Sequence, residues 1–222
     1  MPAGSPEETH ASARMDGFDP ITSFGRDASL RYDAEDTRGD EEETVSFLAR
    51  LAGHQEALEL AVGTGRIALP LTRAGVSVDG VELSQHMVDR MREKPGEDQV
   101  KVTIDNMSCV NTGRSYGLVY LVYNTIGNLL TQDDQVLCFE NAARHLTDDG
   151  VFVLECRVPT APSRPGRQFV DAERIGVDHV VLDVCRYDPE PEPVHTLAYA
   201  RARWTIRWVS TVLSCARTAT GC

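Results

Sequence analysis

The segment Leu58-Glu59-Leu60-Ala61-Val62-Gly63-Thr64-Gly65-Arg66 decides the fold of this chain. An apolar run typical of a buried strand leads into two closely spaced glycines, and then into a helix that we predict over about residues 66–74. Glycines allow the backbone of such a turn to adopt conformations closed to other residues and to approach a ligand closely. The unpaired N–H groups at the start of the helix suit an anion such as a carboxylate. The segment therefore predicts a ligand site between a strand and a helix.

Strand and helix patterns alternate along most of the chain. We predict strands at about residues 57–61, 76–83, 100–104, 116–122, 151–155, 179–187 and 203–209. The helices have apolar faces that we expect to be buried: Phe47, Leu48, Leu51 and Ala52 after the N-cap Asp40, and Val136 and Phe139 in a later helix. This order predicts the α/β class, with a Rossmann-like, doubly wound, mostly parallel sheet that has helices on both faces.

Two carboxylates favour one class of ligand over another. Glu82 stands at the end of the second predicted strand, where a carboxylate can accept hydrogen bonds from both hydroxyls of an adenosine ribose. The residues from Gly63 to Ala68 also fit G-x-G-x-x-A, a weak dinucleotide fingerprint. Glu59, however, lies four residues before Gly63, where it would repel a pyrophosphate and suit the ammonium group of S-adenosylmethionine. A turn that holds no ligand is the third interpretation.

Four segments of the chain resemble the class I S-adenosylmethionine-dependent methyltransferases, in particular the small-molecule type common in actinobacteria. The resemblance covers about residues 30–187. It is carried by ALELAVGTGRIALPL (57–71), VDGVELSQHMV (78–88), LVYLVYNTIGNLLTQDDQ (118–135) and HLTDDGVFVLE (145–155). The resemblance implies a methyltransferase whose cofactor is S-adenosylmethionine and whose acceptor is a small molecule, which we expect to belong to secondary metabolism.

The resemblance also implies which residues form the site. Asn106 stands where the family usually has the acid that meets the adenine amino group, and Ala61 replaces a frequent glycine. We expect the cofactor to contact Tyr32, Glu59, Ala61, Gly63, Thr64, Gly65, Arg66, Glu82, Leu83, Met87, Asp105, Asn106, Met107, Leu121 and Tyr123. We expect the acceptor to contact Asn124, Glu155 and Arg157.

The chemistry of methyl transfer makes few demands on catalytic side chains. Displacement at a sulfonium is already activated by the charge of the leaving group, so alignment and exclusion of water can carry most of the catalysis. We therefore expect neither a metal nor a nucleophile. Glu155, at the end of the fifth predicted strand, can take a proton from an amine or a hydroxyl, or it can be a solvated strand end.

Composition and charge exclude several other classes of function. The formal net charge is −12, and residues 1–44 hold twelve acids against four arginines. An acidic chain without a basic stripe argues against a nucleic-acid partner. We see neither a secretory signal nor an apolar run of about 18 residues, so we expect no membrane partner and a cytoplasmic location. The six cysteines form no C-x-x-C pair, which favours reduced thiols and no zinc site.

The domain organisation follows from these patterns. We expect a disordered acidic leader over residues 1–30, a methyltransferase domain over 31–187 and an atypical C-terminal segment over 188–222. That last segment is rich in proline at its start and departs from the sixth and seventh strands of the family. A methyltransferase-like protein without activity and a dinucleotide-dependent oxidoreductase are the alternative functions.

Overall fold

The computed structural model describes residues 19–35, 39–156, 168–175, 179–187, 197–209 and 212–216. These residues form two units, each with its own sheet. The larger unit holds the glycine turn and every predicted site residue that the structure describes, while Arg157 lies outside the described residues.

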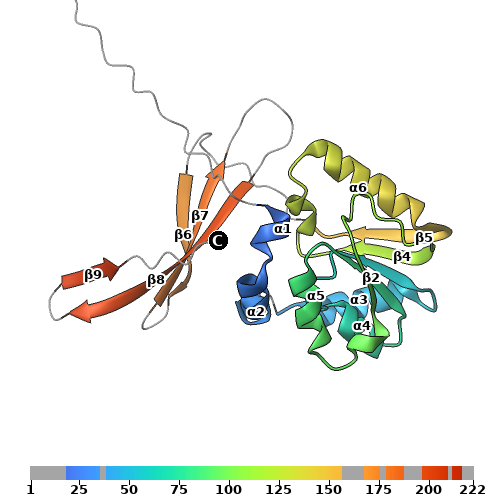
Figure 1. The fold of residues 1–222 in the computed structure, drawn as a ribbon, viewed down its shortest axis with the longest axis horizontal. Helices are drawn as coiled ribbons and strands as arrows, with labels where there is room; N and C mark the ends of the chain where they lie inside the picture. Colours follow the sequence, from blue (N-terminus) through green and yellow to red (C-terminus); the bar gives the residue numbers. More distant parts are fainter. Residues whose placement is uncertain are drawn as a thin grey trace, which may run out of the picture. The chain divides into compact units, whose positions relative to one another are not determined.

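The larger unit is built on a five-stranded parallel sheet (Figure 1). Its strands are β1 (Ala57–Leu60), β2 (Val78–Glu82), β3 (Lys101–Ile104), β4 (Tyr116–Leu121) and β5 (Leu146–Leu154). The strand order is β3-β2-β1-β4-β5, and all four neighbouring pairs are parallel. The order reverses between β1 and β4, and ligands of open α/β sheets bind beyond the carboxyl ends of the strands at such a point.

Helices cover both faces of this sheet. The helices of the unit are α1 (Pro20–Ser23), α2 (Arg26–Glu35), α3 (Glu41–Ala52), α4 (Ala68–Arg73), α5 (Gln85–Arg92) and α6 (Gln132–Arg144), with short 3₁₀ turns η1 (Glu97–Gln99) and η2 (Thr125–Asn128). Side chains of α3, α4 and α5 form one core cluster with alternate residues of β1 and β4, such as Ala57 and Tyr120. Side chains of α6 form the second cluster with the intervening residues, such as Leu58 and Leu121. The predicted doubly wound fold is thereby confirmed.

The smaller unit is a four-stranded sheet in the order β6-β7-β8-β9. Its strands are β6 (Gln168–Ile175), β7 (His179–Tyr187), β8 (Leu197–Val209) and β9 (Val212–Ala216), with β8 and β9 antiparallel. The strand predicted at 179–187 is present with those bounds. Because β7 and β8 belong to one sheet, the chain does not divide at residue 187 as the sequence predicted.

Helices begin earlier in the chain than the sequence predicted. Residues 19–30, which we expected to belong to a disordered leader, form α1 and most of α2. The cause is local, since the Asp19 carboxylate accepts a hydrogen bond from the Ile21 N–H at 2.9 Å and Pro20 occupies the first turn. Residues 1–18 lie outside the described part of the chain.

Two helices bury a different face from the predicted one. In α3, Val45, Leu48 and Ala52 are buried, whereas Phe47 is 46% exposed and Leu51 39% exposed. In α6, Cys138, Asn141 and Ala142 are buried, whereas Val136 and Phe139 are exposed. The burial of Asn141 explains the second case, because its side-chain N–H donates to the Met107 carbonyl at 3.0 Å.

Candidate functional site

The glycine turn follows β1 at the carboxyl edge of the sheet. Ala61, Gly63 and Gly65 all have left-handed backbones, with φ values of 57°, 57° and 76°. This conformation is unfavourable for an alanine, which agrees with the glycine that the resemblance implies at position 61. The Val62 N–H donates to the Val81 carbonyl at 2.8 Å, so the turn is fixed to the end of β2.

Glu82, the predicted ribose acid, is held against this turn. Its Oε2 accepts from the Gly63 N–H at 2.8 Å, and its Oε1 accepts from the Ser84 N–H at 2.9 Å. Burial raises the pKa of the carboxyl, and hydrogen bonds from the Ser84, Gly63 and Leu83 backbone oppose that rise. A carboxylate has about four lone-pair sites, so the group can still accept a hydrogen bond from a ligand hydroxyl.

Glu59 lies beneath the turn, with only 3% of the residue exposed. The Tyr120 hydroxyl donates to its Oε2 at 2.9 Å, and the backbone N–H of Ala68, the first residue of α4, is its other hydrogen-bond donor. Burial raises the pKa of Glu59 to about 8. Its closest partners are therefore groups of the protein that hold α4, and its contact with a ligand ammonium stays a prediction.

Arg66 lies between two aromatic rings. Its guanidinium is 4.6 Å from the ring centre of Tyr32 on α2 and 5.2 Å from that of Tyr123, and it donates to the Tyr32 carbonyl at 3.3 Å. These cation–π contacts bring the first and the last predicted cofactor residues together beside the glycine turn.

The turn after β4 has an unusual backbone. Tyr123 and Asn124 are consecutive non-glycine residues with positive φ, 61° and 58°. The Glu155 Oε2 accepts from the Tyr123 N–H at 3.1 Å, so the end of β5 supports this turn. Strained backbone of this kind gathers at functional sites. The structure brings the predicted acceptor residues Asn124 and Glu155 to the same edge of the sheet.

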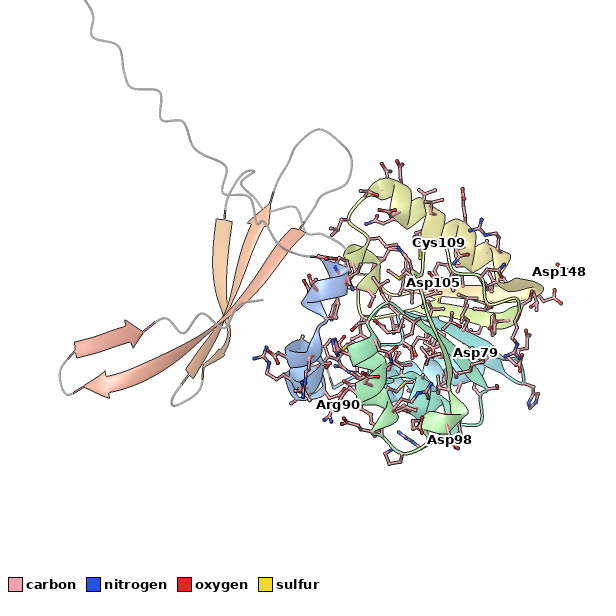
Figure 2. All side chains as sticks on the ribbon, in the orientation of Figure 1. Asp79, Arg90, Asp98, Asp105, Cys109 and Asp148 are labelled. Atoms are coloured by element: carbon pink, nitrogen blue, oxygen red, sulfur yellow. The ribbon has the colours of Figure 1, made fainter. Side chains whose placement is uncertain are left out.

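The residues predicted to contact the adenine lie in the segment after β3. The Asp105 N–H donates to the Glu82 carbonyl at 3.0 Å, and Figure 2 labels the Asp105 side chain. The Asn106 Oδ1 accepts from both the N–H and the hydroxyl of Ser108, each at 2.9 Å. Met87 and Met107 are buried, Leu83 is half-buried, and Leu121 is part of the core. Asn106 therefore caps its own turn, and its contact with adenine stays a prediction.

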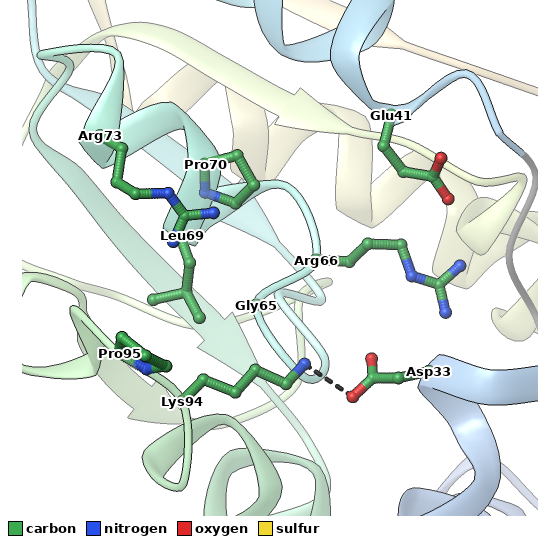
Figure 3. A pocket seen from close by; sticks show the side chains of 9 residues that line it. All are labelled: Asp33, Glu41, Gly65, Arg66, Leu69, Pro70, Arg73, Lys94 and Pro95. Carbon is green, nitrogen blue, oxygen red and sulfur yellow. Dashed lines mark ion pairs between the residues drawn. The ribbon is translucent and has the colours of Figure 1, made fainter.

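Two charged residues that the sequence analysis missed contact the centre of the glycine turn. The Thr64 hydroxyl donates to Asp33 Oδ1 at 2.6 Å, and the Lys94 ammonium donates to the Thr64 carbonyl at 2.7 Å. The same ammonium pairs with Asp33 Oδ2 at 2.7 Å, as Figure 3 shows. The position of Asp33 directly after Tyr32 is the signal that could have indicated it.

A cavity of about 380 Å³ lies beside this ion pair (Figure 3). Its lining residues are Asp33, Glu41, Gly65, Arg66, Leu69, Pro70, Arg73, Lys94 and Pro95. Only Gly65 and Arg66 among them were predicted to bind the cofactor, and Glu82 is absent from its wall. The cavity therefore lies next to the predicted site and does not coincide with it.

Metal clusters and membrane-spanning helices are absent from the described part of the chain. No group of three or more His, Cys, Asp or Glu side chains there is placed to hold a metal ion. None of the helices that the structure describes has the length and apolarity needed to cross a membrane.

Comparison with protein families and curated proteins points to one activity class. Residues 57–150 match the family model described as a methyltransferase domain. The chain is 26% identical over 109 residues to the cypemycin N-terminal methyltransferase of Streptomyces sp, covering 49% of this chain and 44% of that protein. It is 26% identical over 100 residues to the putative methyltransferase YqeM of Bacillus subtilis, covering 44% and 40%. The matches span less than half the length of these curated relatives.

Solved structures extend the similarity over more of the chain. The CcbJ methyltransferase from Streptomyces caelestis is 30% identical, with a TM-score of 0.72 over 85% of this chain and 76% of that chain. The sugar N-methyltransferase KedS8 from Streptoalloteichus is 19% identical, with a TM-score of 0.56 over 98% and 82%, and shows a similarity of fold alone. The parallel sheet, the glycine turn with Glu82 and the 30% sequence identity to a solved relative show that the chain belongs to the class I S-adenosylmethionine-dependent methyltransferases.

Proposed function

We propose that this chain binds S-adenosylmethionine at the glycine turn and transfers its methyl group to a small-molecule acceptor. The observation that carries the proposal is the placement of Glu82, which accepts from the Gly63 N–H and can still accept a hydrogen bond from the ribose. The site lies at the carboxyl ends of β1 and β2, beside the point where the strand order reverses.

The residues around the turn fit the parts of this cofactor. Glu82 suits the ribose, and the segment Asp105-Asn106-Met107 after β3 suits the adenine. Arg66, whose guanidinium lies against the rings of Tyr32 and Tyr123, suits the carboxylate of the methionine part. When bound, the cofactor supplies an activated methyl group on a sulfonium.

The contribution of the protein is orientation and exclusion of water. Glu82 and the glycine turn fix one end of the site, and the Tyr123–Asn124 turn supported by Glu155 fixes the side that faces the acceptor. Alignment of donor and acceptor is the main source of catalysis in a displacement of this kind. Asn124, Glu155 and Arg157 are the residues we propose for contact with the acceptor.

We propose a small molecule of secondary metabolism that carries an amine as the first acceptor to test. The names of three relatives support this choice. The sugar N-methyltransferase KedS8 and the glycopeptide N-methyltransferase MtfA are named for methylation of nitrogen, and the cypemycin N-terminal methyltransferase is named for a chain terminus, where a peptide carries its amine. A panel of amino sugars and peptide amines, with mass spectrometry of the products, tests the acceptor separately from the cofactor.

Calorimetric titration with S-adenosylmethionine, S-adenosylhomocysteine and NADH tests the cofactor. We expect the first two to bind and NADH not to bind. Glu82→Ala should weaken binding by about 1–3 kcal/mol, because it removes charged hydrogen bonds. Glu97→Ala, which breaks an ion pair with Arg92 outside the site, should bind as the parent chain does. Binding of NADH alone, or no binding of any of the three to a folded sample, would overturn the proposal.

A further inference from the structure

Thr64 is the middle residue of the glycine turn and is only 1% exposed. Its hydroxyl and its carbonyl both bond to charged side chains: the hydroxyl donates to Asp33 at 2.6 Å, and the carbonyl accepts from Lys94 at 2.7 Å. The Asp33–Lys94 ion pair, at 2.7 Å, closes the triangle. We call these three residues the turn clamp.

The members of the turn clamp come from three separate elements. Asp33 belongs to α2, Thr64 to the turn after β1, and Lys94 follows Glu93, the C-cap of α5. Two further contacts join the same N-terminal segment to the site. Arg66 donates to the Tyr32 carbonyl, and the Ser84 hydroxyl donates to the Phe24 carbonyl at 2.6 Å. The glycine turn is thus attached to α2 on one side and to the end of α5 on the other.

Within the turn clamp, Asp33 and Lys94 each stabilise the charged form of the other. The side chains of Lys94 and Asp33 are 26% and 30% exposed, so each is partly withdrawn from water. Burial works to raise the pKa of Asp33, yet hydrogen bonds from Lys94 and Thr64 outweigh it and the pKa is lowered. Burial lowers the pKa of Lys94, and Asp33 opposes that change. Loss of either charge leaves the other half-buried without its main partner.

We propose that Asp33 and Lys94 are positioning residues for the cofactor, acting through Thr64 to hold the glycine turn in the conformation that binds it. The inference rests on the proposed function, because it assigns a role in that same site. Neither residue needs to touch the cofactor. Gly63, whose N–H donates to Glu82, directly precedes Thr64 in the chain, so release of Thr64 loosens the turn at the point where the ribose is proposed to bind.

The chain offers a matched control for this proposal. Arg92 and Glu97 form an ion pair at 2.9 Å near the end of the same helix, with side chains 36% and 34% exposed. Their contacts join α5 to η1 and the start of β3, and Arg92 also donates to the Val100 carbonyl at 3.1 Å. Removal of this pair therefore tests an ion pair of similar exposure that does not hold the turn.

The experiment measures the affinity and the dissociation rate of S-adenosylhomocysteine for the full chain and its variants. We expect Lys94→Met and Asp33→Asn to raise the Kd about tenfold, mostly through faster dissociation, since hydrogen bonds to charged groups contribute on the order of this factor. Arg92→Met should leave both quantities unchanged. Lys94→Arg, which keeps the charge, should recover most of the affinity. Circular dichroism and the thermal midpoint confirm that each variant is folded.

The outcomes separate this inference from the proposed function. If the parent chain does not bind S-adenosylhomocysteine, the proposed function itself fails. If the parent chain binds and folded Lys94→Met binds equally well, the proposed function stands and the positioning role is wrong. A role in stability alone would lower the thermal midpoint of Lys94→Met without changing the dissociation rate measured well below that midpoint, and this result would also overturn the inference.

Discussion

Substitution of Gly65 by alanine should destabilise the chain through two separable effects. The residue has φ of 76°, which an alanine adopts only with strain. An added Cβ would also lie 2.7 Å from both Cγ and Sδ of Met91 and 2.9 Å from Cγ of Leu69. These distances are far shorter than normal contacts between carbon atoms, so the side chains of α5 and α4 would have to move.

The two effects have known magnitudes, and Gly63 shows the backbone effect without the steric one. A left-handed alanine costs roughly 1–2 kcal/mol, and an extra methyl in a packed core costs roughly 1–3 kcal/mol. Gly65→Ala should therefore lose about 2–5 kcal/mol of unfolding free energy. Gly63, with φ of 57°, would place its Cβ 3.6 Å from Met87 Cε, an ordinary contact, so Gly63→Ala should lose only about 1–2 kcal/mol.

Urea denaturation at a constant m-value measures both losses. Gly75→Ala provides the control, because φ is 92° and no atom lies within 4 Å of the added Cβ. It should show the conformational cost alone and leave the binding of S-adenosylhomocysteine unchanged, whereas Gly63→Ala should weaken that binding. If Gly65→Ala is no more destabilising than Gly63→Ala, then Met91 does not fix the turn as the structure indicates, and the packing argument is refuted.

Three other predictions follow from buried polar groups. Burial raises the pKa of Glu59 to about 8 from its ordinary value of 4.5. Between those pH values the folded chain holds a proton that the unfolded chain has released, so stability falls as pH rises, and Glu59→Gln should remove this slope in urea denaturation between about pH 5 and pH 8. Burial raises the pKa of the Cys138 thiol to about 11, so iodoacetamide at about pH 8 should label the exposed Cys109 in the native protein and Cys138 only after unfolding, as read by peptide mass spectrometry. Asn141→Ala should lose about 1–3 kcal/mol in thermal denaturation, since the Met107 carbonyl loses its buried donor, and a loss below about 0.5 kcal/mol would contradict that role.

The part of the site that the sequence predicted well is the part formed by local patterns. The strand, the two glycines and the helix start lie within one short segment, and Glu82 ends the next strand of a parallel sheet. Carboxyl ends of parallel strands meet at one edge, so the closeness of Gly63 and Glu82 follows from the strand order alone. The same reasoning brought Tyr123 and Glu155 to that edge.

The contacts that the sequence did not predict depend on how separate elements pack. Asp33 and Lys94 are far apart along the chain and lie among other charged residues, which is the usual pattern of a solvated face. His145 gives a similar lesson, because a histidine in a predicted helix is more often a surface residue. It is buried, with Nδ1 2.8 Å from the Asn141 carbonyl and Nε2 accepting from the Thr112 N–H at 3.2 Å. In α3 the exposure of Phe47 shows that apolar residues also remain at surfaces.

The Gly63 and Ser84 N–H groups that bond to Glu82 decide whether its side chain loses conformational entropy during folding or during cofactor binding. Because the Gly63 and Ser84 N–H groups orient the carboxylate within the folded chain, its rotamers are restricted during folding, and little of that cost remains for the binding step. Affinity for the cofactor is then tied to the local opening free energy of the segment between β1 and α5, in addition to any contact with the ligand. Hydrogen exchange at those two amides in the ligand-free protein would report that opening directly.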